Sequence, residues 1–131
     1  MDSNLKLNLS AKSEQIVQDK DTAKALGSGR AEVFATPRMI ALMENAAYTA
    51  VQPVLAKGRS TVGTAINAKH LAATPVGIKV WAKATLCEID RKKLTFTIEA
   101  HDETELIGTA VHERFIIDEQ KFADKANTKA K

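Results

Sequence analysis

The chain has little of several residue types. It contains a single cysteine, Cys87, among 131 residues, which excludes an internal disulfide and a zinc site built from clustered cysteines. Aromatic residues make up only 5%, too few for the stacking platforms on which many proteins bind bases. No apolar run is longer than a few residues, so we expect no membrane-spanning helix and no membrane partner.

The remaining composition is that of one ordinary globular domain. Hydrophobic residues make up 44% and charged residues 27% of a chain whose length fits one domain. The start, Met1-Asp2-Ser3-Asn4, lacks the basic-then-apolar order of a secretory leader. Together with the lone cysteine, this predicts a reducing, cytoplasmic location.

The net charge of +3 is confined to one end of the chain. Four lysines and one aspartate follow Gln120 and account for the whole excess, so the rest of the chain is neutral. Charge runs of this kind most often face solvent. We therefore expect a domain over residues 1–120, a flexible basic tail over 121–131, and no nucleic-acid partner.

The longest helical pattern begins at Thr36. Threonine is a good N-cap, and Pro37 is well suited to the first helical position. Apolar residues then recur at helical spacing between Met39 and Leu55, with Pro53 tightening the last turn and Gly58 ending the segment.

Alternating patterns typical of β-strands cover residues 5–9, 62–71, 76–86, 94–100 and 107–117. One strand, a long helix and then a meander of strands predict the α+β class. A long apolar helix wrapped by a curled antiparallel sheet is the hotdog arrangement. Such a sheet leaves an edge strand uncovered, which favours a homodimer or a higher homo-oligomer.

Glu44 is out of place in this helix. Arg38 lies near the centre of the polar arc of this helix. Glu44 is about 120° away from it around the helix axis, which places Glu44 at the border of the apolar face. A half-buried carboxylate is costly unless it is paired. The residue either reaches out to solvent, bonds Tyr48 one turn later, or takes part in chemistry.

His70 is the second polar residue on an apolar face, because it follows Ile66 and Ala68 along one predicted strand. It is either a satisfied core histidine or half of a carboxylate–imidazole pair with Glu44. Such a pair supplies a base near neutral pH together with its orienting partner. The other histidines lie on other strands without metal-ligand spacing, so no metal site is predicted.

Thr36 is the third candidate. Its simplest role is the N-cap itself, but no Glu or Gln stands at position 39 to complete a capping box, so the hydroxyl can have another role. The free backbone N–H groups at a helix N-terminus can also bind an anion or a developing oxyanion.

Six collinear stretches carry a family resemblance. They are Glu32-Val33-Phe34-Ala35-Thr36, Leu42-Met43-Glu44, Gly63-Thr64-Ala65-Ile66, His70 with Ala72-Ala73-Thr74-Pro75, Ala100-His101-Asp102, and His112-Glu113-Arg114. Over about residues 32–122 the chain resembles the fluoroacetyl-CoA thioesterase family of the hotdog superfamily. The resemblance implies a catalytic triad of Thr36, Glu44 and His70. It also implies that Gly63 is an active-site glycine and that Arg114 lies near the acyl and pantetheine end.

One position departs from the family. The fluoroacetate-selective member has a phenylalanine gate just before the long helix, and Arg30 stands at the aligned position here. A loop of Gly27-Ser28-Gly29-Arg30 cannot supply the same apolar lid. We therefore expect thioester hydrolysis without fluoroacetyl selectivity, and the acyl group is left open.

The implied reaction is hydrolysis of a short-chain acyl-CoA to a carboxylate and free coenzyme A, with no cofactor beyond the substrate. Glu44 would attack the carbonyl or activate water, and His70 would carry the proton. Thr36 would position the substrate or be the nucleophile. The alternatives are a non-hydrolytic hotdog enzyme, such as an enoyl-CoA hydratase, and an acyl-CoA-binding module.

The spacing of two triad residues sets a geometric problem. Thr36 and Glu44 are eight residues apart, roughly 12 Å along an ideal helix. Either substrate lies between them, the helix starts late, or Thr36 reaches across a dimer interface.

Overall fold

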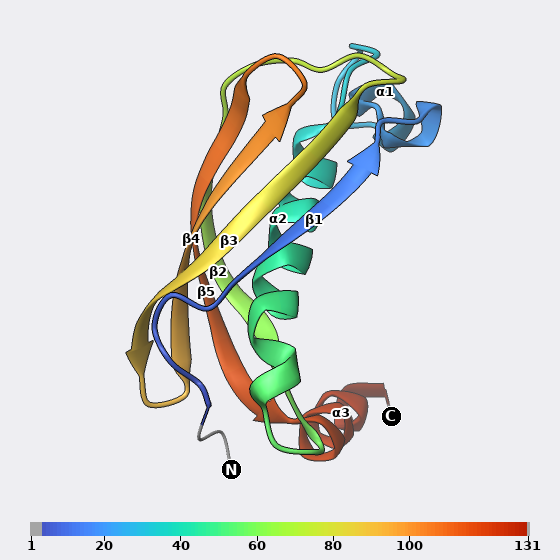
Figure 1. Ribbon diagram of the computed structural model, residues 1–131. Coiled ribbons are helices and arrows are strands. Elements are labelled where there is room, and N and C mark those ends of the chain that lie inside the picture. Colours follow the sequence, from blue (N-terminus) through green and yellow to red (C-terminus); the bar gives the residue numbers. More distant parts are fainter. Residues whose placement is uncertain (1–3, 131) are drawn as a thin grey trace.

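The computed structural model describes residues 4–130. Residues 1–3 lie outside the described residues, and most of the prediction of a missing leader depends on them. Residue 131, the end of the predicted tail, also lies outside. A five-stranded antiparallel sheet curls around one long helix (Figure 1), which confirms the α+β prediction.

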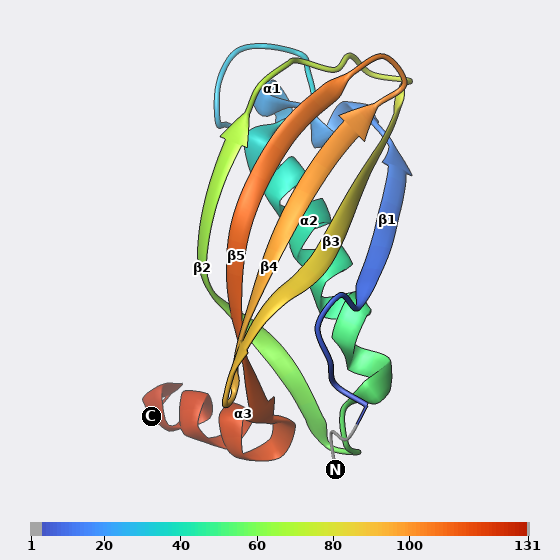
Figure 2. The ribbon, with the colours of Figure 1, turned by 60° about the vertical axis from the view of Figure 1, so that its left-hand side comes forward.

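The strands run in the order β1-β3-β4-β5-β2 across the sheet. Their bounds are β1 (Ser10–Ile16), β2 (Arg59–His70), β3 (Lys79–Asp90), β4 (Lys93–Asp102) and β5 (Leu106–Asp118). Figure 2 shows β1 at one edge and β2 at the other, with the helix behind the sheet. Both edges are unpaired within the described part of the chain.

The long helix α2 (Thr36–Val51) fills the concave side of the sheet. It follows the turn η1 (Asp19–Asp21) and the short helix α1 (Ala23–Leu26), and Pro53 lies in the 3-10 turn η2 (Gln52–Val54) that ends it. Its inner stripe packs on apolar residues of the strands to form the core. The buried residues of this stripe are Met39, Leu42, Met43, Ala46, Ala47, Ala50 and Val51.

The prediction that Thr36 is the N-cap is wrong by one residue. Ala35 is the N-cap: its backbone is extended, and its carbonyl accepts the first helical hydrogen bond, from the N–H of Met39 at 2.9 Å. Thr36 is the first helical residue, and Pro37 follows it in the first turn, where a missing N–H costs nothing. The hydroxyl of Thr36 is therefore not engaged in capping.

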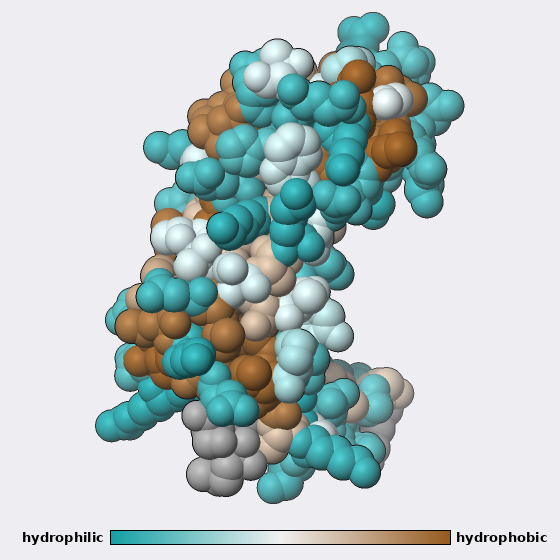
Figure 3. Space-filling model, viewed as in Figure 1, coloured by the Kyte–Doolittle hydropathy of each residue, from teal (hydrophilic) through white to brown (hydrophobic). Residues whose placement is uncertain are grey.

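The predicted strand at residues 5–9 is also wrong. Asn8 adopts a left-handed backbone conformation, with φ of 73°, which turns the chain before β1 begins at Ser10. Leu5 and Leu9 still pack partly against the core, whereas Leu7 is half exposed. Figure 3 shows apolar surface gathered at this lower end of the molecule, where the N-terminal segment meets the β3–β4 hairpin.

A β-bulge in β2 overturns the predicted pairing of faces. The register with β5 shifts between Gly63 and Ala65, so the side chains before the bulge switch faces relative to those after it. The side chain of Thr61 and the side-chain position of Gly63 therefore face inward, as His70 does. Strict alternation along the strand, without the bulge, would place Gly63 on the face opposite to that of His70.

The basic C-terminal segment forms the helix α3 (Glu119–Asn127) and the turn η3 (Thr128–Ala130). The carboxylate of Asp118 caps this helix by accepting the N–H of Lys121 at 2.9 Å. No residue of α3 is buried. The flexibility of this segment stays a prediction. Within residues 4–130 the helices are too short and too polar to cross a bilayer.

Asp21 fixes the N-terminal end of α2. Its side chain is 1% exposed and accepts hydrogen bonds from the backbone of Gln18 (2.9 Å), from Gln15 (3.1 Å) and from Nε of Arg38 (3.0 Å). A second Arg38 nitrogen lies 3.0 Å from the same carboxylate. One buried charge thus ties β1, η1 and the first turn of α2 together.

We expect Asp21→Asn to lower the free energy of unfolding by about 2–3 kcal/mol, because it removes a buried charge from its donors. Arg38 is 39% exposed and can be solvated, which limits the loss. Urea unfolding at pH 7 measures it. Glu14→Gln is the matched control, since Glu14 pairs with Lys12 and Lys79 only at the surface. Equal losses in both variants would contradict the role of Asp21.

Candidate active site

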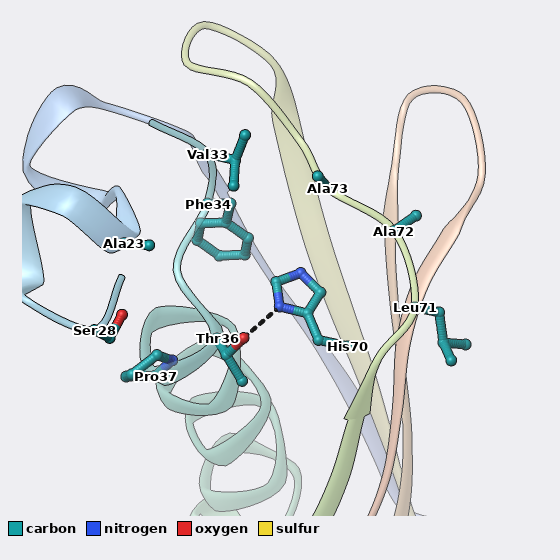
Figure 4. A pocket seen from close by; sticks show the side chains of 10 residues that line it. All are labelled: Ala23, Ser28, Val33, Phe34, Thr36, Pro37, His70, Leu71, Ala72 and Ala73. Carbon is teal, nitrogen blue, oxygen red and sulfur yellow. Dashed lines mark hydrogen bonds between the residues drawn. The ribbon is translucent and has the colours of Figure 1, made fainter. Parts of the chain in front are cut away.

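The start of α2 and the end of β2 together hold a threonine–histidine pair. The hydroxyl oxygen of Thr36 lies 2.7 Å from Nδ1 of His70, across 34 residues of sequence. Figure 4 shows this contact inside a pocket that the segments after β2 and before α2 enclose. We call it the Thr36 pocket, and its lining residues are Ala23, Ser28, Val33, Phe34, Thr36, Pro37, His70, Leu71, Ala72 and Ala73.

His70 is tuned toward its neutral form. Burial lowers its pKa below the usual histidine value, and the backbone of Ala72 offsets part of this shift. The Nε2 atom is buried and has no well-formed hydrogen bond to any residue within 4–130. A neutral imidazole that bonds a hydroxyl at one nitrogen and leaves the other unsatisfied is suited to proton transfer.

Glu44 lies in a different pocket, at the middle of α2. We call it the Glu44 pocket, and its lining residues are Ala41, Glu44, Asn45, Tyr48, Thr61, Val62, Gly63 and Arg114. A Cβ added to Gly63 would lie 3.1 Å from a carboxylate oxygen of Glu44 and 3.4 Å from Nη1 of Arg114. Glycine therefore leaves room for the carboxylate and the guanidinium to share this space.

Arg114 is 8% exposed, although arginine is rarely buried without partners. Its Nε donates to the hydroxyl of Thr61 at 2.8 Å, and Nη2 donates to the Thr61 carbonyl at 2.9 Å. Nη1 lies 3.1 Å from Nε2 of His112. Burial lowers the pKa of Arg114, and the charge of Glu44 acts in the opposite direction.

The structure does not bring Glu44 and His70 together within one chain. The Thr36 and Glu44 pockets have no lining residue in common. Gly63, beside Glu44, is seven residues from His70, roughly 23 Å along an extended strand. Because α2 begins at Thr36, a late helix start does not explain the separation. The candidate residues thus form two half-sites at opposite ends of β2.

His112 is the polar residue of the site that the sequence interpretation missed. Alternation along 107–117 predicts a face of Val111 and Phe115, but both are exposed. The inward face instead carries His112 and Arg114. His112 and Arg114 occupy every second position between the apolar Ala110 and Ile116, and this is the signal that could have identified the face as part of the site.

Arg30 is exposed in the loop between α1 and Phe34. The side of the Thr36 pocket nearest this loop is lined by Ala23 and Ser28. The small residues here do not replace an aromatic lid.

The chain matches one protein family over most of its length. The profile described as fluoroacetyl-CoA-specific thioesterase matches residues 17–120. The fluoroacetyl-CoA thioesterase of Streptantibioticus cattleyicolor is 42% identical over 98 residues, covering 75% of this chain and 70% of that protein.

Solved structures agree with this match. The fluoroacetyl-CoA thioesterase superimposes with a TM-score of 0.89 and 34% identity, over 95% of this chain and 97% of that one. A threonine-to-serine variant of it in complex with acetyl-CoA gives a TM-score of 0.91 and 32% identity, over 97% and 100%. A thioesterase superfamily member from Thermus thermophilus gives 0.85 and 26%, over 96% and 97%. These neighbours confirm the hotdog fold.

Proposed function

Because this chain belongs to the fluoroacetyl-CoA-specific thioesterase family, a family of thioester hydrolases, we propose that it hydrolyses a short-chain acyl-CoA to a carboxylate and free coenzyme A. The observation that carries this proposal is the hydrogen bond between Thr36 and His70 inside a pocket at a helix N-terminus. A hydroxyl bonded to an imidazole is a typical acyl-transfer arrangement. The free N–H groups of the first helical turn can stabilise charge on the carbonyl oxygen.

A thioester needs only modest assistance, because its carbonyl is electrophilic and its thiolate leaves readily. Glu44 attacks the carbonyl, giving a transient mixed anhydride, or removes a proton from the attacking water. His70 carries the proton between water and the departing thiolate. Thr36 holds the substrate, or itself attacks, with its hydroxyl fixed by His70.

The separation of the half-sites is resolved when two copies pair through β2. Two β2 edges that pair antiparallel about a two-fold axis at Asn67 place His70 of one copy opposite Thr64, next to Gly63, of the other. Neighbouring strands lie about 4.8 Å apart, so the Thr36 pocket of one copy then adjoins the Glu44 pocket of the other. We therefore propose a homodimer in which each active site takes Thr36 and His70 from one copy and Glu44 from its partner.

Gly63 and Arg114 then bind the substrate. Gly63 lets the thioester pass close to the backbone, and Arg114 offers its remaining N–H groups to polar or anionic groups of the substrate. Coenzyme A enters as part of the substrate, and this chemistry needs neither a metal nor a further cofactor.

Thiol release from a panel of acyl-CoAs tests the proposed function. We expect free coenzyme A to appear with short-chain substrates, and little preference for fluoroacetyl-CoA over acetyl-CoA, because Arg30 does not supply an aromatic lid. An enoyl-CoA hydratase would give a hydrated product without free thiol, and a binding module would saturate without turnover. Either outcome would refute hydrolysis.

A further inference from the structure

His112 lies on the inner face of β5, is 1% exposed, and has no role in the chemistry proposed above. Its Nδ1 lies 2.8 Å from the carbonyl oxygen of Ala65, and its Nε2 lies 3.1 Å from Nη1 of Arg114. A carbonyl only accepts hydrogen bonds and a guanidinium only donates them. Nδ1 therefore carries the proton, Nε2 presents its lone pair, and the ring is neutral.

The contact between His112 and Arg114 adds to the hydrogen bonds that hold the guanidinium of Arg114 in place. A guanidinium has five N–H groups, and three of them are occupied: two by Thr61 and one by His112. The other two, one on each terminal nitrogen, are left for the Glu44 pocket, which Arg114 lines. With Nε and both terminal nitrogens held by buried partners, the guanidinium plane cannot rotate.

We infer that His112 is a positioning residue: a neutral imidazole that accepts a hydrogen bond from Arg114 and thereby fixes the guanidinium beside Glu44. The inference rests on the proposed function, because Arg114 meets the substrate only if this pocket binds one. A cationic His112 would place an N–H against the N–H of Arg114 and two positive charges in contact. The neutral form is therefore the one that positions Arg114.

The surroundings of His112 favour that neutral form. Burial is the main cause that lowers its pKa; the Ala65 carbonyl opposes this, and the positive charge of Arg114 lowers the pKa further. The negative charges of Glu44 and Glu113 raise the pKa of His112. Phe96 packs at 6.4 Å between ring centroids and brings no charge.

The direction of this shift sets a pH dependence of stability. As the pH falls below about 6.5, the unfolded chain takes up the proton first, so the folded state loses stability. Tyr48 is the other titratable group that acts on this cluster, through Arg114.

The state of the ring is tested without any activity measurement. In protein labelled with ¹⁵N-histidine, we expect one imidazole at neutral pH with a protonated Nδ1 and an unprotonated Nε2, and we expect this signal to vanish in His112→Gln. A protonated Nε2 on His112 would overturn the inference. If the wild-type protein released no thiol, the proposed function would fail, while this experiment would still report on His112.

Positioning is tested by a double-mutant cycle. His112→Phe keeps a flat ring but offers Arg114 no acceptor, so we expect kcat/KM to fall about tenfold. In the Arg114→Ala background the same change should have less than about a twofold effect, since nothing is left to position. An equal loss in both backgrounds would mean that His112 acts through the fold alone, and would refute the inference.

Two further variants distinguish a loss of positioning from a loss of folding. His112→Gln keeps an amide that can donate to Ala65 and accept from Arg114, so we expect it to retain most of the activity that His112→Phe loses. Failure of Gln to do better than Phe, with both proteins folded by circular dichroism, would also count against positioning. His101→Gln is the control, because His101 stacks on Trp81 away from both pockets.

Discussion

Replacing Glu44 with glutamine is expected to lower kcat at least about a hundredfold, with little change in unfolding. The amide keeps the size and polarity of the side chain but can neither attack a thioester nor accept a proton from water. Glu44 is only partly buried, so the fold tolerates the change. Single-substrate kinetics with the preferred acyl-CoA measure the effect.

Thr49→Ala is the matched control, because Thr49 lies on α2 near Glu44 but is exposed and lines neither pocket. We expect its kcat to stay within about twofold of wild type. A Glu44→Gln enzyme with near-wild-type kcat would remove Glu44 from the reaction and leave Thr36, bonded to His70, as the nucleophile.

The role of Glu44 is resolved by isotope labelling. In heavy-oxygen water under single turnover, attack by Glu44 places label in its carboxylate when water opens the anhydride on that side. Activation of water by Glu44 places label in the product alone. Mass spectrometry of the peptide that contains Glu44 separates attack by Glu44 from activation of water. Attack by Thr36 would also leave the label in the product alone, because water opens the threonine ester at the acyl carbon.

Most of the fold follows from the periodicity of the sequence. The helical spacing from Met39 onward and the alternation over 76–86 and 94–100 each report one buried face, and burial of those faces dominates the structure. The alternation over 62–71 and 107–117 predicts strands, but the buried faces of these strands differ from the predicted ones. The errors fall where backbone conformation decides. Asn8 turns the chain at a positive φ that no hydrophobic pattern records, and Ala35 rather than Thr36 caps α2.

The site was harder to predict, for physical reasons that particular residues show. Gly63 has no side chain, so only the bulge beside it reveals which face it serves. Which nitrogen of His112 carries the proton depends on the Ala65 carbonyl, 47 residues away in sequence, and on the neighbouring guanidinium of Arg114. Glu44 and His70 belong to pockets at opposite ends of β2, a separation that no pattern within one chain predicts.

That separation gives the second large effect, which is a gain of activity on mixing two inactive chains. Glu44→Gln and His70→Ala should each retain at most about 1% of wild-type activity as homodimers. In a mixed dimer, one site combines the intact His70 of the first chain with the intact Glu44 of the second. The other site carries both defects. Random pairing makes half of the dimers mixed, so an equal mixture refolded together should recover about a quarter of wild-type activity.

The reciprocal mixture provides the control. A chain that carries both substitutions is refolded with an equal amount of wild type. If the sites are shared between copies, both sites of every mixed dimer are then inactive. About a quarter of the activity of an all-wild-type sample then remains, whereas sites contained within one chain would leave about half. Light scattering establishes that the samples are dimeric. A monomer, or a first mixture no more active than its separate components, would show that Glu44 and His70 do not meet across β2.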